Sequence, residues 1–120
     1  MKQELSIVQS ARLIELGVDA RRASNFTSNV MFDANGVECY DHKPIFTFVD
    51  VIGLLPPTIY SVEREIDYSL HIVRGNFTSA AYYAHSIYNK GFGPTKYAGE
   101  LIDTLYELLV WTIQNKHCKL

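Results

Sequence analysis

The sequence predicts an α+β fold in which an antiparallel β-hairpin, or a small three-stranded sheet, packs against a long C-terminal helix. Two patterns carry this prediction. Apolar and polar residues alternate through residues 62–73, as in a strand with one buried face. Through residues 95–115 apolar residues recur at helical spacing instead. Helices are also expected near the N-terminus, ahead of these two elements.

The composition indicates one folded domain spanning residues 1–120. Of the 120 residues, 48% are hydrophobic and 20% are charged, and eight are Tyr and six are Phe. This balance differs clearly from the low hydrophobicity and high charge of disordered chains. The formal charge of -2 provides no broad attraction to a nucleic-acid backbone or an anionic membrane. Neither nucleic acid nor a membrane is therefore expected as a partner.

The N-terminal third predicts two helices and then a long loop. Residues 5–16 have helical periodicity, and Gly17 is placed to end that helix in the left-handed conformation. Asp19 is a suitable N-cap for a short helix through Ala23. Residues 24–43 lose any period and are rich in Asn, Asp, Ser and Gly, which predicts a long loop. Such a loop is either functional, mobile, or contains a short element that the pattern does not reveal.

Residues 44–55 fit either a strand or a helix, and we favour the helix. Their β-branched and aromatic residues suit a strand. Thr47 and Asp50, however, have the spacing of a capping box, and Pro56 with Pro57 would stop a helix sharply.

The alternating stretch at residues 62–73 is expected to turn back at Gly75 and Asn76 and to return through residues 77–88. A two-residue turn then sets the register of the hairpin. On the inner face it places Tyr68 opposite Tyr83, Leu70 opposite Ala81, and Ile66 opposite His85.

The last helix, residues 95–115, should bury one wide apolar stripe on this hairpin. Trp111 falls outside the stripe, on the side of Glu100, Thr104 and Glu107, and is therefore expected on a polar face. The stripe consists of Ala98, Leu101, Ile102, Leu105, Leu108, Leu109 and Ile113.

Three aromatic residues are the candidate binding residues. Trp111 on its polar helix face, and Tyr82 and Tyr88 on the outer sheet face, are of the types enriched in interface anchors. Cover by other parts of the chain is an equal alternative, and the hairpin edge offers strand addition as a second route to association. The leading hypothesis is a non-enzymatic protein that binds a protein partner or itself, with a homodimer as one form.

Two chemical alternatives remain open. Cys39 and His42 have the spacing of zinc ligands, and His117 with Cys118 could complete a set of four in a small zinc-binding or nucleic-acid-associated regulatory protein. Against this, adjacent residues such as His117 and Cys118 rarely reach the same tetrahedral ion.

The second alternative is a small hydrolase. Strand alternation would place Glu63, Glu65 and Asp67 in one row, with His71 as a general base. Solvated acidic decoration of an open sheet is the commoner explanation of such a row, and a core histidine is the commoner explanation of His85. No phosphate-binding glycine loop or nucleophile-elbow motif is present, so neither a cofactor nor an enzymatic activity is expected.

The cysteine content and the apolar pattern of the sequence indicate the cellular compartment. Two cysteines do not form a disulfide framework, and the opening residues do not read as a secretory signal. No apolar run reaches the length of a membrane span. We therefore expect a cytoplasmic protein.

Three short segments resemble a known group of proteins. They are Arg12-Leu13-Ile14-Glu15-Leu16-Gly17-Val18-Asp19 leading to Ala23-Ser24, Leu54-Leu55-Pro56, and Glu100-Leu101-Ile102-Asp103 through Trp111 to Asn115-Lys116. Together they resemble small uncharacterised proteins of phages, prophages and mobile elements of gut Bacteroidales. The resemblance implies an accessory protein of the infected or lysogenic cell and a helix over residues 48–55. It implies no activity and no site residues.

Overall fold

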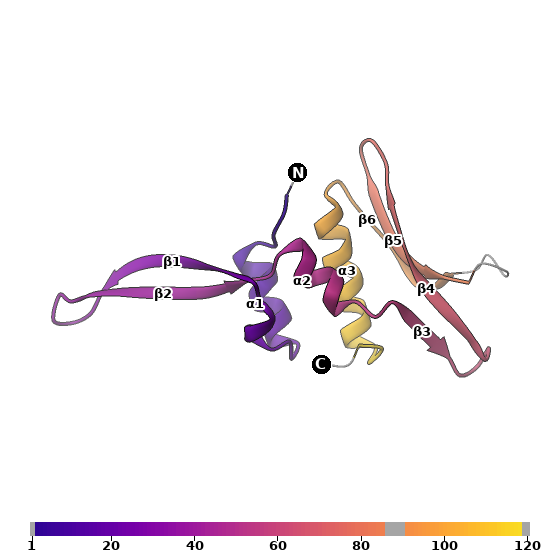
Figure 1. The fold of residues 1–120 in the computed structure, drawn as a ribbon, viewed down its shortest axis with the longest axis horizontal. Coiled ribbons are helices and arrows are strands. Elements are labelled where there is room, and N and C mark those ends of the chain that lie inside the picture. Colours follow the sequence, from indigo (N-terminus) through magenta and orange to yellow (C-terminus); the bar gives the residue numbers. More distant parts are fainter. Residues whose placement is uncertain (1, 86–90, 119–120) are drawn as a thin grey trace.

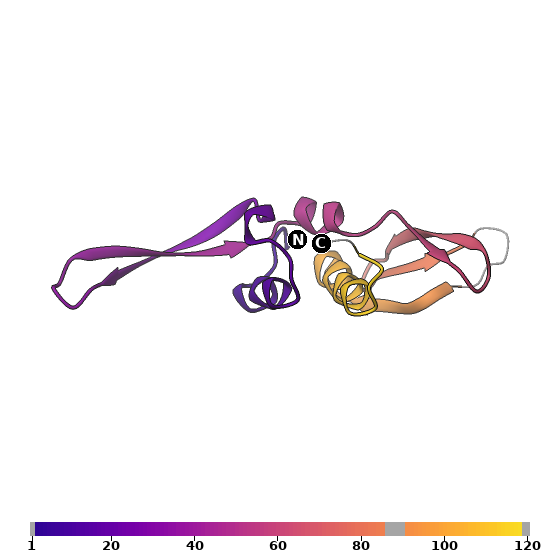
Figure 2. The ribbon, with the colours of Figure 1, turned by 90° about the horizontal axis from the view of Figure 1, so that it is seen from below.

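The computed structural model describes residues 2–85 and 91–118 and shows an elongated α+β protein of 64 × 33 × 17 Å (Figure 1). A two-stranded ribbon extends from one end, helices occupy the middle, and a four-stranded sheet forms the other end (Figure 2). The elements in chain order are α1 (Ile7–Glu15), the 3₁₀ turn η1 (Ala20–Arg22), β1 (Asn25–Phe32), β2 (Glu38–Ile45), α2 (Phe48–Leu54), β3 (Thr58–Ser61), β4 (Ile66–Arg74), β5 (Ser79–Ala84), β6 (Gly91–Ala98) and α3 (Leu101–Gln114).

The two N-terminal helical segments form where the sequence predicts them. Ser6 caps α1 by accepting a hydrogen bond from the backbone N–H of Gln9, and the Gln9 side chain accepts from Ser6 N–H in return. Gly17 follows α1 with φ of 108°, the left-handed conformation expected of a helix-ending glycine. Asp19 caps the single turn η1 through Arg21 N–H.

The predicted long loop at residues 24–43 is wrong, because β1 and β2 form an antiparallel hairpin there. Asp33 begins its turn, and its carboxylate accepts hydrogen bonds from the backbone N–H groups of Asn35 and Val37. Alternation arises only where one face of a strand is buried. The outer part of this ribbon is exposed on both faces, so its sequence does not alternate. We call the β1–β2 ribbon, residues 25–45, the arm.

The predicted helix over residues 44–55 is confirmed only in part. Strand β2 runs to Ile45, and α2 begins at Phe48. The capping box is present, since Thr47 and Asp50 exchange hydrogen bonds between side chain and backbone. The helix ends just before Pro56 and Pro57, as the sequence predicts.

The sheet has the order β3-β4-β5-β6, and all its pairs are antiparallel. The stretch predicted as one strand, residues 62–73, is divided. Residues 62–65 form a turn in which Ser61 C=O accepts from Glu65 N–H, and Glu65 adopts a φ of 55°. Residues 58–61 before this turn form β3 instead.

The predicted register of the hairpin is wrong by two residues. Leu70 lies opposite Tyr83 and Ile72 opposite Ala81, because four residues, 75–78, connect β4 to β5 instead of two. A slip of two keeps every residue on its face. Tyr68, Ala81 and Tyr83 are therefore fully buried on the inner face, as predicted.

The C-terminal helix packs on the sheet as predicted but begins later. Residues 95–98 belong to edge strand β6, so Ala98 is a sheet residue and not part of the helix stripe. Helix α3 contacts β5, β6 and α2, so it is buried over a wide arc of its surface and not along a single narrow stripe. Its buried residues are Ile102, Thr104, Leu105, Leu108, Leu109 and Thr112.

Removing the hydroxyl of Tyr83 should weaken the junction of the sheet and α2. The Tyr83 hydroxyl donates to the Pro56 carbonyl at 2.7 Å, and burial raises the pKa of the phenol. Tyr83→Phe leaves this carbonyl without its donor, so we expect a loss of roughly 1–3 kcal/mol in the free energy of unfolding. Urea unfolding measures it. The control Tyr97→Phe, at a side chain that is 68% exposed, should change stability by less than about 0.5 kcal/mol.

Candidate interaction surface

The arm exposes large apolar side chains well away from the core. Phe26, Val30 and Phe32 lie on one face of β1, and they are 58%, 52% and 72% exposed. Met31 is exposed on the other face, and Val37 is exposed beyond the turn. The rings of Phe26 and of His42 from β2 meet at a near-perpendicular angle, with centroids 5.0 Å apart. The arm therefore carries an uncovered apolar surface along β1 and at the end of its turn.

The root of the arm, in contrast, is firmly anchored. Ile45 and Phe46 are buried, and Phe46 C=O accepts from Leu5 N–H at 2.9 Å. Asp50 accepts from the backbone N–H groups of Ser24 at 2.7 Å and Thr47 at 2.9 Å, and also from the Ser24 hydroxyl. A single carboxylate thus joins the start of α2 to the residue before β1.

Burial acts to raise the pKa of Asp50, but the hydrogen bonds from Ser24 and Thr47 outweigh it and hold that pKa below its ordinary value. The charged form is therefore the one that the root stabilises.

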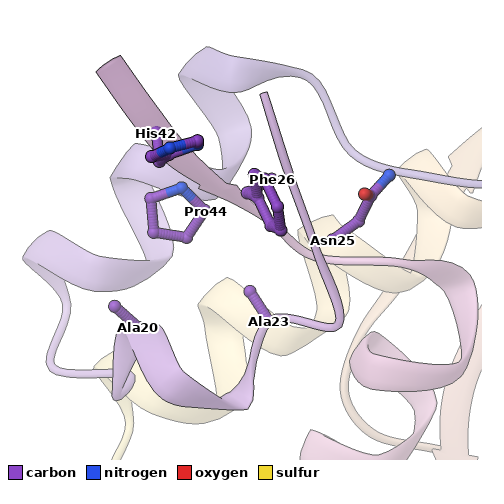
Figure 3. A pocket seen from close by; sticks show the side chains of 6 residues that line it. All are labelled: Ala20, Ala23, Asn25, Phe26, His42 and Pro44. Carbon is purple, nitrogen blue, oxygen red and sulfur yellow. The ribbon is translucent and has the colours of Figure 1, made fainter. Parts of the chain in front are cut away.

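A hollow of about 370 Å³ lies between η1 and the arm root (Figure 3). Its lining is largely apolar and extends the exposed surface of the arm toward the body. The lining residues are Ala20, Ala23, Asn25, Phe26, His42 and Pro44. In this hollow Phe26 and Pro44, which pair across the arm, face the two alanines of the η1 region.

The sheet offers a second surface, on the side away from the helices (Figure 2). We call it the outer sheet face. Tyr82 lies there as predicted, and its ring stacks on His71 of β4 at 5.4 Å with the planes 7° apart. Tyr60 and Tyr97 are exposed on the same face. Tyr88, the other predicted sheet residue, lies outside the described residues.

Trp111 does not lie on an open polar face. Its indole is half-buried against the core and packs on β6, directly over Gly93. The expectation failed because α3 is enclosed over a wide arc, and Thr104, predicted on the same polar side, is fully buried. His117 also meets the indole, with ring centroids 5.2 Å apart. Trp111 therefore packs α3 against the sheet. Its role in an interface stays a prediction.

The four candidate zinc ligands are not gathered into one site. Cys39 and His42 lie on the arm, whereas Cys118 donates to Leu54 C=O at 3.2 Å beside α2. Burial raises the pKa of the Cys118 thiol. Within residues 2–85 and 91–118, no group of three or more His, Cys, Asp or Glu is close enough to hold a metal ion.

The acidic row predicted for a hydrolase does not form along one strand. Glu63 and Glu65 lie in the turn after β3, and only Asp67 is in β4, on the outer sheet face. His71, the proposed base, stacks on Tyr82. His85 follows β5 and is partly buried, and the shifted register of β4 with β5 excludes its predicted pairing with Ile66.

Comparisons with protein-family models, curated proteins and solved structures gave no significant match. In the part of the chain that the structure describes, no helix has the length and apolar character needed to cross a membrane.

Sequence reasoning missed the arm, although one signal for it was available. Asp33-Ala34-Asn35-Gly36 has the residue types of a tight turn, and it lies between the apolar residues Phe32 and Val37. Strands on either side of such a turn would give a hairpin at the observed place. Periodicity alone could not reveal it.

Gly93→Ala tests the packing of Trp111. A Cβ atom at Gly93 would lie 2.3 Å from two indole atoms, so the ring must move. We expect a loss of about 2–4 kcal/mol in the free energy of unfolding and a red shift in emission from the sole tryptophan. Gly36→Ala is the matched control, with the same φ of 77° and nothing within 4 Å. A similar red shift in both variants would contradict the assigned packing.

The stability that Asp50 provides should depend on pH. Its pKa is depressed in the folded chain, so its contribution is present above about pH 4 and is lost as the pH falls further. Asp50→Asn should cost roughly 1–2 kcal/mol at pH 7, and the difference from wild type should shrink toward pH 3. Urea unfolding at both pH values measures this. The control Asp67→Asn should stay within about 0.5 kcal/mol of wild type, and a gap that persists at pH 3 would count against the anchor.

Proposed function

We propose that this chain is a non-enzymatic accessory protein that acts through protein–protein contact, and that the arm makes the contact. The observation that supports this proposal is the exposure of Phe26, Val30 and Phe32 on a ribbon that extends beyond the body (Figure 1). An isolated two-stranded ribbon is only marginally stable in water, and a contiguous exposed apolar surface is typical of a binding site. A protein partner that covers the arm would stabilise the ribbon and bury its exposed apolar surface.

The outer sheet face supports the same proposal as a secondary surface. Tyr60, Tyr82 and Tyr97 present aromatic rings with polar tips on an uncovered sheet. Tyrosine contributes large contact area at low entropic cost, which suits a protein interface. Tyr82 thus keeps the binding role proposed from the sequence, and the arm replaces Trp111 as the principal contact.

The charge of the arm favours a protein over a nucleic-acid partner. It carries Asp33, Glu38 and Asp41 against the single Lys43. An acidic ribbon would repel a phosphate backbone. The proposed setting is the cytoplasm of a bacterial cell that carries a phage or mobile element, and it rests on the resemblance of the segments around Arg12 and Trp111.

Site-specific photo-crosslinking in producing cells tests the proposal. We would place p-benzoylphenylalanine at Phe32 on the arm, and separately at Phe77, an equally apolar position that is 91% exposed in the β4–β5 turn. Irradiation should give discrete protein adducts from position 32 and none from position 77. Because both side chains are exposed, neither replacement should disturb the fold. Adducts that are absent at both positions, or equal at the two, would refute the role of the arm.

A further inference from the structure

In the part of the chain that the structure describes, four strand edges bond to no other strand, and they belong to β1, β2, β3 and β6. Three of these edges, those of β2, β3 and β6, are protected against pairing. Strand β3 is only four residues long. Strand β6 contains Gly93 and Pro94, and its pairing with β5 is interrupted by a register shift. Short length, proline and bulges are the features by which proteins prevent edge-to-edge pairing.

The two edges of the arm differ from each other. Strand β2 contains Glu38, Asp41, Lys43 and Pro44, so charge and a missing N–H group protect it. Strand β1, Asn25–Phe32, is equally long but has no charged residue, no proline and no glycine. Its phenylalanines, Val30 and Thr27 favour extended structure. Strand β1 is therefore the unprotected edge among the residues that the structure describes.

The β1 edge can accept a second copy of this chain more readily than the edges of β2, β3 or β6 can. An uncharged strand meets no like charge when it pairs with itself, whereas the acidic residues of β2 and of the turn would repel a second arm brought to the β2 side. Pairing β1 with β1 leaves both β2 strands at the outside. It also uses the one unprotected edge of each copy, so the assembly closes at two chains.

Symmetry restricts the register of such a pair. A two-fold axis perpendicular to the ribbon keeps each residue on its own face, so a residue can lie opposite only residues from its own face. Phe26, Val30 and Phe32 share one face of β1. The register that places Phe26 opposite Phe32 of the other copy forms two aromatic cross-strand pairs, and it centres the axis on Asn29.

We infer that two copies of this protein form a dimer by antiparallel pairing of β1 with β1, around an axis at Asn29, giving a four-stranded sheet in the order β2-β1-β1-β2. The inference rests on the proposed function and names the chain itself as the partner that pairs with the edge of the arm. Independent stability of a sheet needs three or more strands with a hydrophobic face, which two paired arms have and one arm lacks, so the dimer accounts for an arm without a core of its own. The two bodies lie at opposite ends of this sheet.

Disulfide trapping tests the pairing. In a Cys39→Ser, Cys118→Ser background, Asn29→Cys places the two thiols across the axis, within the reach of a disulfide. The control Asn35→Cys lies in the turn of the arm, and the inferred register separates its two copies by about 40 Å along the strands. Mild oxidation should give a covalent dimer from Asn29→Cys and leave Asn35→Cys monomeric. Equal cross-linking of the two variants would overturn the inferred register.

A charge substitution at the same two positions tests the dimer without cross-linking. Asn29→Lys sets two like charges directly opposite each other, so we expect the dimer dissociation constant to rise at least tenfold, with partial recovery at high salt. Asn35→Lys adds the same charge away from the axis and should leave the constant unchanged. Sedimentation equilibrium measures all three proteins.

The outcomes separate this inference from the proposed function. A wild-type protein that stays monomeric at every concentration overturns the dimer. If position 32 still forms adducts with other proteins, the proposed function stands without it. If position 32 forms none, both are refuted. A dimer that Asn29→Lys dissociates, and that Asn29→Cys traps, supports both.

Discussion

The enclosure of α3 between the sheet and the other helices is the constraint on which the rest of the structure depends. Its leucines at 105, 108 and 109 are fully buried, and Thr104 donates to Ser79 C=O at 3.3 Å on the sheet side. At the other side Asp103 accepts from Lys2 at 2.7 Å and from Gln9 at 3.0 Å. Two separate parts of the chain are thereby held to one helix.

This arrangement explains why the arm can extend without a core. Helix α3 organises both α2 and the sheet, and none of the core residues that the structure describes comes from β1. The arm is connected through a few residues at its root, chiefly buried Phe46 and the Asp50 carboxylate. Side chains such as Phe32 and Val30 bury little in the single chain, and their substitution should change contact much more than folding. Stability and contact thus reside in different parts of the molecule.

The sequence predicted the elements whose pattern reflects burial on one side. Alternation placed Tyr68 and Tyr83 on the inner face, and the capping-box spacing of Thr47 and Asp50 favoured the helix that forms as α2. Where burial was absent or two-sided, periodicity failed. The arm has no buried face to impose alternation, and α3 has too wide a buried arc for Trp111 to be assigned to solvent. Strand β6 was missed, and its end was predicted as helix, because pairing with β5 overrode the helical pattern around residue 95.

The candidate site was hard to predict for the same physical reason. Reasoning from the sequence looked for unusual residues on regular elements and so selected Trp111, which the fold uses for packing over Gly93. The arm instead consists of ordinary residues, and its significance lies in what does not cover them. The other edges are protected by the short length of β3 and by charge or proline in β2 and β6. The contrast with β1 therefore becomes visible only when all four edges are compared. That contrast depends on which strands pair, and strand pairing is fixed by the tertiary structure.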